Sequence, residues 1–389
     1  MVGSMVVQFA LIWWLTSITG SAVALATASI VGIIPTILFS PLAGVLVDRW
    51  PRRKVLIWAD GAIGLTALAL AILVQHGLLQ PWQVYLAIFV RSILGAFHWP
   101  AMQASISLMA PRESLSHIKG LDSALYGILR ITTPPLGALL LNLWPLSLVL
   151  VIDLVTAALA IATVIWAHIP QPPKTGSGTP GVMGELIAGV HYLFSSRGLR
   201  RVLLLAALVN LLAVPFFTLL PIWIRRYYQG GAVEYGWIEA VSGAGILAGG
   251  VLLSLWGGFR QRIFTSMWAL VGMSIGCVMA GLVDSHQFVL AVAAVGVVSM
   301  MQTLVQGPML AVLQDVVPPG LQGRVLTLLD STSSLMAPLG LALAGVLSDA
   351  YYPQMWFLVC AGGFAVLAVA AMTSRPVRRI ELDMRDDGG

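Results

Sequence analysis

Charge is scarce in this chain. Only 10% of its 389 residues are charged, whereas 58% are hydrophobic and the mean hydropathy is +0.91. A soluble globular domain carries about 25% charged residues. So few charges cannot cover the surface of a water-soluble protein, which excludes a soluble enzyme and a disordered chain. The composition indicates an integral membrane protein.

Cysteine and the common catalytic motifs are also scarce. The two cysteines, Cys277 and Cys360, lie in apolar stretches, which excludes a disulfide scaffold and favours inert buried thiols. The sequence has no GxxxxGK[ST] phosphate loop, no HExxH and no Cys/His cluster with zinc spacing. We therefore expect no enzyme activity, no cofactor and no metal site. The net charge of +5 lies at the ends of hydrophobic runs, which favours a role in topology over nucleic-acid binding.

Apolar runs of membrane-spanning length are abundant. Most of them reach the ~20 residues that a helix needs to cross a bilayer, and helices satisfy their own backbone groups in lipid. The first run begins at Met1 and would span only ~27 Å, so we expect a truncated first helix. The pattern predicts an all-α fold with twelve transmembrane helices, at residues 1–18, 21–47, 54–74, 82–108, 120–142, 146–166, 199–224, 236–256, 263–283, 287–313, 325–348 and 353–373.

Basic residues predict the orientation of these helices. If the N-terminus faces the cytoplasm, seventeen of the 21 Lys and Arg residues fall in cytoplasmic connections, and only Arg225 and Arg226 fall in connections on the opposite side. This asymmetry follows the positive-inside rule. We therefore expect both termini to be cytoplasmic.

A linker divides the helices into two halves of six. Residues 167–198 open with a Pro-, Gly- and Ser-rich stretch and continue with apolar residues at helical spacing, which predicts a short amphipathic helix. We predict a six-helix bundle over 1–166, a second bundle over 199–373 and a cytoplasmic tail over 374–389.

The two halves also share a pattern. Pro100 and Asp122 recur as Pro308 and Asp330 with one offset of 208 residues. This favours a parallel repeat of two pseudo-symmetric bundles, with a pathway between them near the membrane midplane.

The loop between the second and third helices carries a family resemblance. Its sequence, GVLVDRWPRRK, resembles the signature loop of the major facilitator superfamily of transporters; the matching residues are Gly44, Asp48, Arg49, Arg52 and Arg53. Two interpretations of the loop stay open. It is a latch that pairs with neighbouring helix ends in one conformation, or it is a positive-inside anchor with no gating role.

The fourth and fifth helices extend the resemblance. Arg91 to Gly95 matches the family's Arg-x-x-x-Gly, and Pro134 and Gly137 remain from an exporter motif of helix five in which two glycines are replaced. Stretches such as QFALIWWLTSITGSA look like bacterial exporters of the macrolide-efflux and enterobactin-exporter branch. The resemblance covers residues 1–373. It implies the major facilitator fold and a location in the bacterial cytoplasmic (inner) membrane.

Four charged residues lie well inside the predicted spans of the N-terminal half, away from the span ends: Asp60, Arg91, Arg130 and Asp153. Charges within a membrane are costly and usually face a partner or a cavity. We expect Asp153 to pair with Arg130 or Arg91. This network either senses protonation or is a static ion pair that fixes helices four to six. Asp60 either pairs with nearby basic residues or binds a proton.

The substrate path is placed by the resemblance along helices one, four, seven and ten. Their aromatic, methionine and uncharged polar residues suit bulky amphipathic molecules, although each of them also has a plain structural explanation, such as lipid contact or core packing. The candidate cavity residues are Gln8, Trp13, His98, Met102, Asn210, Phe217, Met301, Gln302 and Gln306.

These observations favour a secondary active exporter. It would exchange an amphipathic organic compound for protons as two halves rock between inward and outward states. The expected partners are a small-molecule substrate, protons and membrane lipid, with no nucleic acid, and the expected state is a monomer. Two alternatives stay open: a carrier of a siderophore or lysolipid, and a membrane sensor or scaffold that does not transport.

Overall fold

The structure, a computed structural model, describes residues 1–109, 114–167, 197–317 and 319–378. Within these ranges every regular element is a helix, and twelve helices are long and apolar enough to cross a membrane. The predicted all-α membrane fold is therefore confirmed. The predicted amphipathic linker helix lies outside the described residues, as does most of the tail.

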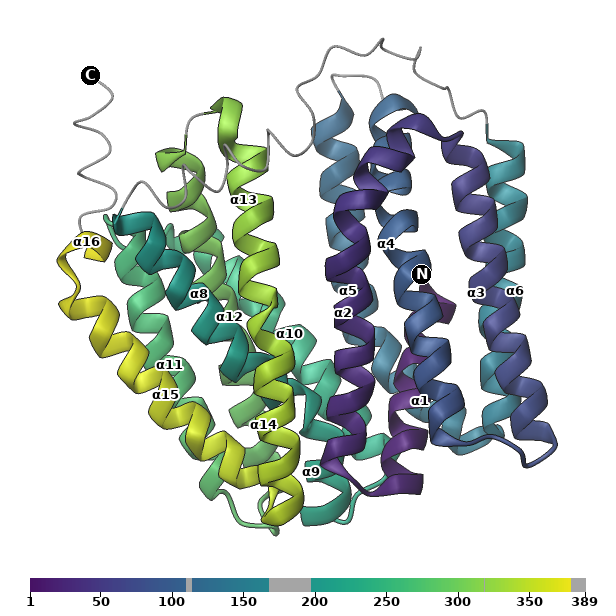
Figure 1. The fold of residues 1–389 in the computed structure, drawn as a ribbon. Coiled ribbons are helices and arrows are strands. Elements are labelled where there is room, and N and C mark those ends of the chain that lie inside the picture. The colour runs from purple at the N-terminus through teal and green to yellow at the C-terminus, as the bar shows by residue number, and fades with distance from the viewer. Residues whose placement is uncertain (110–113, 168–196, 318, 379–389) are drawn as a thin grey trace. The chain divides into compact units, whose positions relative to one another are not determined.

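The chain forms two compact units (Figure 1). The first comprises Met1–Gly176 and Ile224–Ala240, and the second comprises Ser177–Trp223 and Val241–Gly389. The short segment Ile224–Ala240 follows the seventh span in sequence but groups with the first unit, because its side chains pack against α1 and α5 as described below.

The first unit contains the six helices of the N-terminal half. These helices are α1 (Val2–Thr19), α2 (Ala22–Arg49), α3 (Arg52–Gln75), α4 (Pro81–Met109), α5 (Leu115–Leu143) and α6 (Leu146–Trp166). The remaining helices follow residue 196. They are α8 (Arg197–Thr218), α9 (Leu220–Tyr227), α10 (Ala232–Trp256), α11 (Arg262–Leu282), α12 (Phe288–Val316), α13 (Pro319–Ser334), α14 (Met336–Ala350), α15 (Pro353–Thr373) and α16 (Arg375–Arg378).

The expected truncation of the first helix is wrong. α1 is continuous over 18 residues and is one of the twelve candidate spans. At 1.5 Å per residue it covers ~27 Å, close to the ~30 Å of a hydrocarbon core. Gly20 ends it with a φ of 54° and an N–H bond to the Thr16 carbonyl, and the Ser21 hydroxyl then accepts the Ala24 N–H at the start of α2.

Helix packing in the first unit brings α3, α4 and α6 together. α3 packs against both α4 and α6, while α1 lies against α5 and α6. Gly64 on α3 allows this closeness, because a Cβ there would lie 3.1 Å from the Ala157 Cβ of α6. Charged side chains on α3, α4 and α6 can therefore meet inside the unit.

The second unit is built around α11, which packs against α12 and α15. Two runs predicted as single helices are broken here: 199–224 becomes α8 and α9, and 325–348 becomes α13 and α14. Each break comes two or three residues before a proline, Pro221 or Pro338, whose missing N–H cannot continue the hydrogen-bond ladder. By contrast, Pro100 and Pro308 lie inside unbroken helices.

A close approach between α10 and α12 gives a stability prediction. A Cβ at Gly249 would lie 2.6 Å from the Met300 carbonyl oxygen, whereas a Cβ at Gly250 would meet no atom within 4 Å. We expect Gly249→Ala to destabilise the protein by about 1–3 kcal/mol through overpacking, less the ~1 kcal/mol that alanine gains as a helix former. Thermal unfolding in detergent should show a decrease in Tm for Gly249→Ala and no decrease for its neighbour Gly250→Ala. Equal Tm values for the two variants would contradict the close approach.

Candidate functional site

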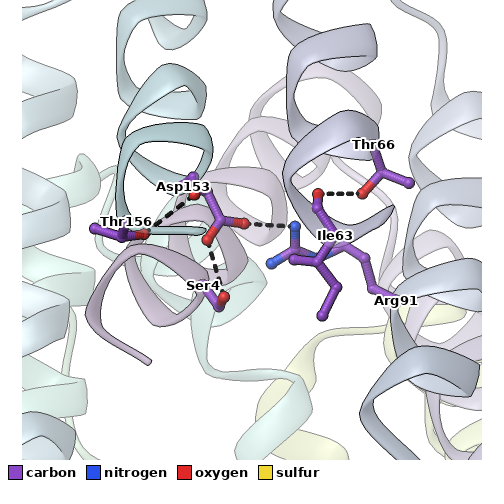
Figure 2. A network of polar contacts seen from close by, with 6 residues as sticks. All are labelled: Ser4, Ile63, Thr66, Arg91, Asp153 and Thr156. Atoms are coloured by element: carbon purple, nitrogen blue, oxygen red, sulfur yellow. Dashed lines mark hydrogen bonds and ion pairs between the residues drawn. The ribbon is translucent and has the colours of Figure 1, made fainter. Parts of the chain in front are cut away.

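A buried ion pair joins α4 to α6 in the first unit (Figure 2). The Arg91 Nη1 atom of α4 lies 2.7 Å from the Asp153 Oδ2 atom of α6, with side-chain exposures of only 10% and 2%. The other carboxylate oxygen, Oδ1, accepts a hydrogen bond of 2.9 Å from the Ser4 hydroxyl of α1. Of the two arginines considered from the sequence, Arg91 is therefore the one that pairs with Asp153.

The first turn of α1 is shaped for this contact. A Cβ at Gly3 would collide with the Thr156 hydroxyl and lie 3.0 Å from the Asp153 Cα atom, so only glycine lets α1 approach α6 this closely. Gly3 and Ser4 were not predicted as site residues from the sequence. The adjacent small residues at the start of an apolar helix were the available signal, since small residues mark close helix contacts in membranes.

A second titratable pair lies on α3 and α4. The His98 Nε2 atom is 3.2 Å from the Asp60 Oδ1 atom, and the side chains are 22% and 17% exposed. The sequence assigned His98 to a substrate cavity and left two roles open for Asp60. The structure instead places these two residues against each other.

The basic loop between α2 and α3 reaches two other helices. Arg52 is buried and donates from Nη1 to the Ala104 carbonyl of α4 at 3.2 Å, and Arg53 donates to the Ile165 carbonyl at the end of α6 at 2.5 Å. Positive charge is favourable near the carbonyl end of a helix. These bonds tie the start of α3 to the final turns of α4 and α6.

The remaining loop residues, Gly44, Asp48 and Arg49, belong to the last part of α2. Their surroundings lie outside the part of the chain that the structure describes. For the latch and anchor interpretations of the loop, the described contacts are therefore those of Arg52 and Arg53.

The helix-five motif forms a close-packed seam with α1 and the start of α10. A Cβ at Gly137 would lie 2.9 Å from the Phe9 ring, and a Cβ at Gly236 would lie 3.2 Å from the Pro134 carbonyl oxygen. The Phe9 ring stacks on Tyr235, with centroids 4.8 Å apart. Phe9 and Tyr235 could not be predicted from the sequence, because their ring contact joins segments more than 200 residues apart.

Arg130 lies elsewhere on α5. Its side chain is exposed, and it is near enough to the half-buried Glu239 of α10 for electrostatic attraction. Arg130 therefore belongs to a different neighbourhood from the Arg91–Asp153 pair. Of the four charges predicted as one network, Arg91 and Asp153 pair with each other, Asp60 pairs with His98, and Arg130 lies near Glu239.

The other candidate cavity residues are divided between the two units. In the first unit, Gln8 is exposed, Trp13 stacks on Tyr235 at 5.9 Å, and Met102 packs against an apolar cluster around Val55.

In the second unit, Asn210 donates to the Ala206 carbonyl, Phe217 contacts Phe216 edge-on, and Met301 lies over Gly272. Gln302 is half-buried and Gln306 is exposed on α12.

Trp13 also lines a pocket of about 640 Å³ in the first unit. The pocket lies where α1 and α5 end and where α6 and α10 begin, and its wall includes Trp14, Trp144, Asn142 and Glu234. Three indole rings beside an acidic side chain form a surface that suits an amphipathic molecule with a cationic group.

The helices, the internal ion pair and the loop fit one known family. A family model described as a transmembrane secretion effector, MFS_3, matches residues 1–387. The chain belongs to this major facilitator family. It is thus a multi-pass membrane transporter and not an enzyme.

Several known proteins resemble this member of the family. Macrolide efflux protein A of Streptococcus pyogenes is 32% identical over 383 residues, which cover 98% of this chain and 95% of the relative. Multidrug efflux pump Tap of Mycolicibacterium fortuitum is 22% identical, covering 95% and 91%. Among solved structures, a bacterial homologue of the iron transporter ferroportin in an inward-facing state has a TM-score of 0.71 at 16% identity, covering 98% and 95%, which supports the fold.

Proposed function

We propose that this chain is a secondary active exporter of amphipathic organic compounds of the macrolide or multidrug class. The observation that carries the proposal is the likeness to Macrolide efflux protein A, which extends over 98% of the chain. The pocket lined by Trp13, Trp14 and Trp144 beside Glu234 supports a bulky amphipathic substrate with a cationic group.

Protons supply the energy in this proposal. The sequence has no GxxxxGK[ST] phosphate loop to support ATP hydrolysis. It does contain ionisable residues within the spans, and such residues commonly form ion or proton pathways. Export then proceeds by alternating access of the two six-helix halves, with each proton that enters the cell driving substrate outward.

The orientation follows from the basic residues. The end of the first unit where Arg52 and Arg53 lie is cytoplasmic, as are both termini, and the protein is a monomer in a bacterial inner membrane. The burial of Arg91 against Asp153 leaves that guanidinium poorly placed to bind an anionic siderophore or lysolipid, so the structure favours neutral or cationic substrates.

Uptake into proteoliposomes tests this function. An acidic lumen should drive accumulation of radiolabelled erythromycin, a macrolide, through molecules whose cytoplasmic side faces outward. Protein-free liposomes report the passive trapping of this weak base, and Arg91→Ala should fall to their level. Accumulation by the wild-type protein no greater than in protein-free liposomes would contradict the proposal.

A further inference from the structure

The Asp60–His98 pair joins α3 to α4 through the 3.2 Å contact of the His98 Nε2 atom with the Asp60 Oδ1 atom. The two side chains are 17% and 22% exposed, which leaves the pair open to water or substrate. Both helices are membrane spans. Ionisable residues within membrane spans are costly and commonly functional, so the presence of this pair needs a physical reason.

We propose that Asp60 and His98 form the proton-binding site of the exporter, while Arg91, Asp153 and Ser4 form a fixed clamp beside it. This rests on the proposed proton exchange and names the residues that perform it. The neutral imidazole of His98 takes a proton from water on one side of the membrane. The imidazolium is then held by the Asp60 carboxylate, and the same proton leaves to water on the other side.

Histidine suits this role because its ordinary pKa lies close to physiological pH, so that modest changes of surroundings load and unload the proton. Arginine cannot do the same, since a guanidinium stays protonated in proteins. The Arg91–Asp153 pair is also closed: its carboxylate bonds to Arg91 through one oxygen and to Ser4 through the other, at 2% exposure. A carboxylate held in this way is a clamp between α1, α4 and α6.

The surroundings of the pair contain few competing charges. α2 and α1, which contact α4, carry no ionisable side chain between Val2 and Val47. α3 adds only Arg52, Arg53 and Lys54 at its start, about two turns before Asp60. α6 adds only Asp153, which is already paired. α5 carries His117, Lys119, Asp122 and Arg130, of which Asp122 accepts a bond from Gln103 of α4.

The clamp and the proton site share one face of α4. Arg91 and His98 are seven residues apart, which is almost two full turns and about 10 Å along the helix axis. The clamp therefore fixes the rotation of α4 that directs His98 toward Asp60. Loading the proton changes the charge on α4 without breaking the clamp.

The experiment compares two transport modes in proteoliposomes. Counterflow, in which unlabelled erythromycin inside exchanges for labelled erythromycin outside, needs no net proton movement. Accumulation driven by an acidic lumen does. We expect Asp60→Asn and His98→Gln to lose about tenfold or more of the gradient-driven rate, while counterflow stays within about twofold of wild type. Retained counterflow also shows that each variant is folded.

Two further variants complete the design. Asp60→Glu keeps a carboxylate and should keep gradient-driven accumulation, and His286→Gln removes an exposed histidine of a turn between α11 and α12 and should change nothing. Variants that lose both modes together, or that keep the gradient drive, would overturn the proton site. If the wild-type protein shows counterflow but no accumulation driven by an acidic lumen, the proposed proton exchange is wrong, and so is the proton site that rests on it.

Discussion

Replacing Asp153 by alanine is expected to destabilise the protein strongly and to abolish transport. The substitution leaves the Arg91 guanidinium, which is only 10% exposed, buried without its carboxylate, and it also removes the acceptor of the Ser4 hydroxyl. Breaking one side of a buried ion pair costs about 3–5 kcal/mol. Thermal unfolding in detergent should show a large fall in Tm, and proteoliposomes should lose gradient-driven erythromycin uptake.

The matched control replaces both partners. Arg91→Met with Asp153→Leu substitutes apolar side chains of similar volume for the pair, which commonly restores or exceeds the original stability. We expect the double variant to recover most of the Tm but not the transport rate, because nothing then directs α4 toward α6. A single Asp153→Ala variant as stable as wild type would refute the clamp.

Substituting valine for Gly137 is expected to open the seam between α1 and α5. A Cβ at this position lies 2.9 Å from a ring carbon of Phe9 and 3.5 Å from its Cβ, so the clash reaches the base of that side chain. Phe9 cannot retreat easily, because its ring is buried and stacks on Tyr235. Overpacking of this kind costs about 1–3 kcal/mol. Tm and erythromycin uptake should both decrease.

A neighbour on the same helix and a compensating change check this seam. Gly120→Val on α5 meets no atom within 4 Å of its added Cβ and should leave Tm and uptake unchanged. Adding Phe9→Ala to Gly137→Val removes the clashing ring and should recover part of the lost uptake. Equal losses for Gly120→Val and Gly137→Val would show that valine itself, and not contact with Phe9, disturbs α5.

The number and type of the helices could be predicted from the sequence. Lipid leaves a span few options, so length and hydropathy alone identified all twelve. The breaks near Leu219 and Leu335 were not predicted, because Pro221 and Pro338 interrupt their helices whereas Pro100 and Pro308 do not. Which prolines break a helix depends on whether neighbouring side chains hold the two segments in line, and this is a property of the packing.

The site was harder to predict than the fold. Hydropathy revealed Arg91 and Asp153 as unusual charges, but two arginines were possible partners and only helix rotation selects between them. His98 was assigned to a cavity from its place on the fourth helix, and its partner Asp60 was missed because it lies 38 residues away on another helix. The clamp residues Gly3 and Ser4 carry no charge at all, so their role follows only from how closely α1 approaches α6.

Direct detection of proton movement is the most direct test of proton-coupled export. Proteoliposomes filled with a pH-sensitive dye, with no initial pH gradient, would receive erythromycin outside. Exchange of substrate for protons should make the lumen more alkaline faster than in protein-free liposomes, because protons leave as substrate enters. His98→Gln should match the protein-free rate. Wild-type alkalinisation no faster than in protein-free liposomes, despite demonstrated erythromycin counterflow, would contradict exchange of substrate for protons.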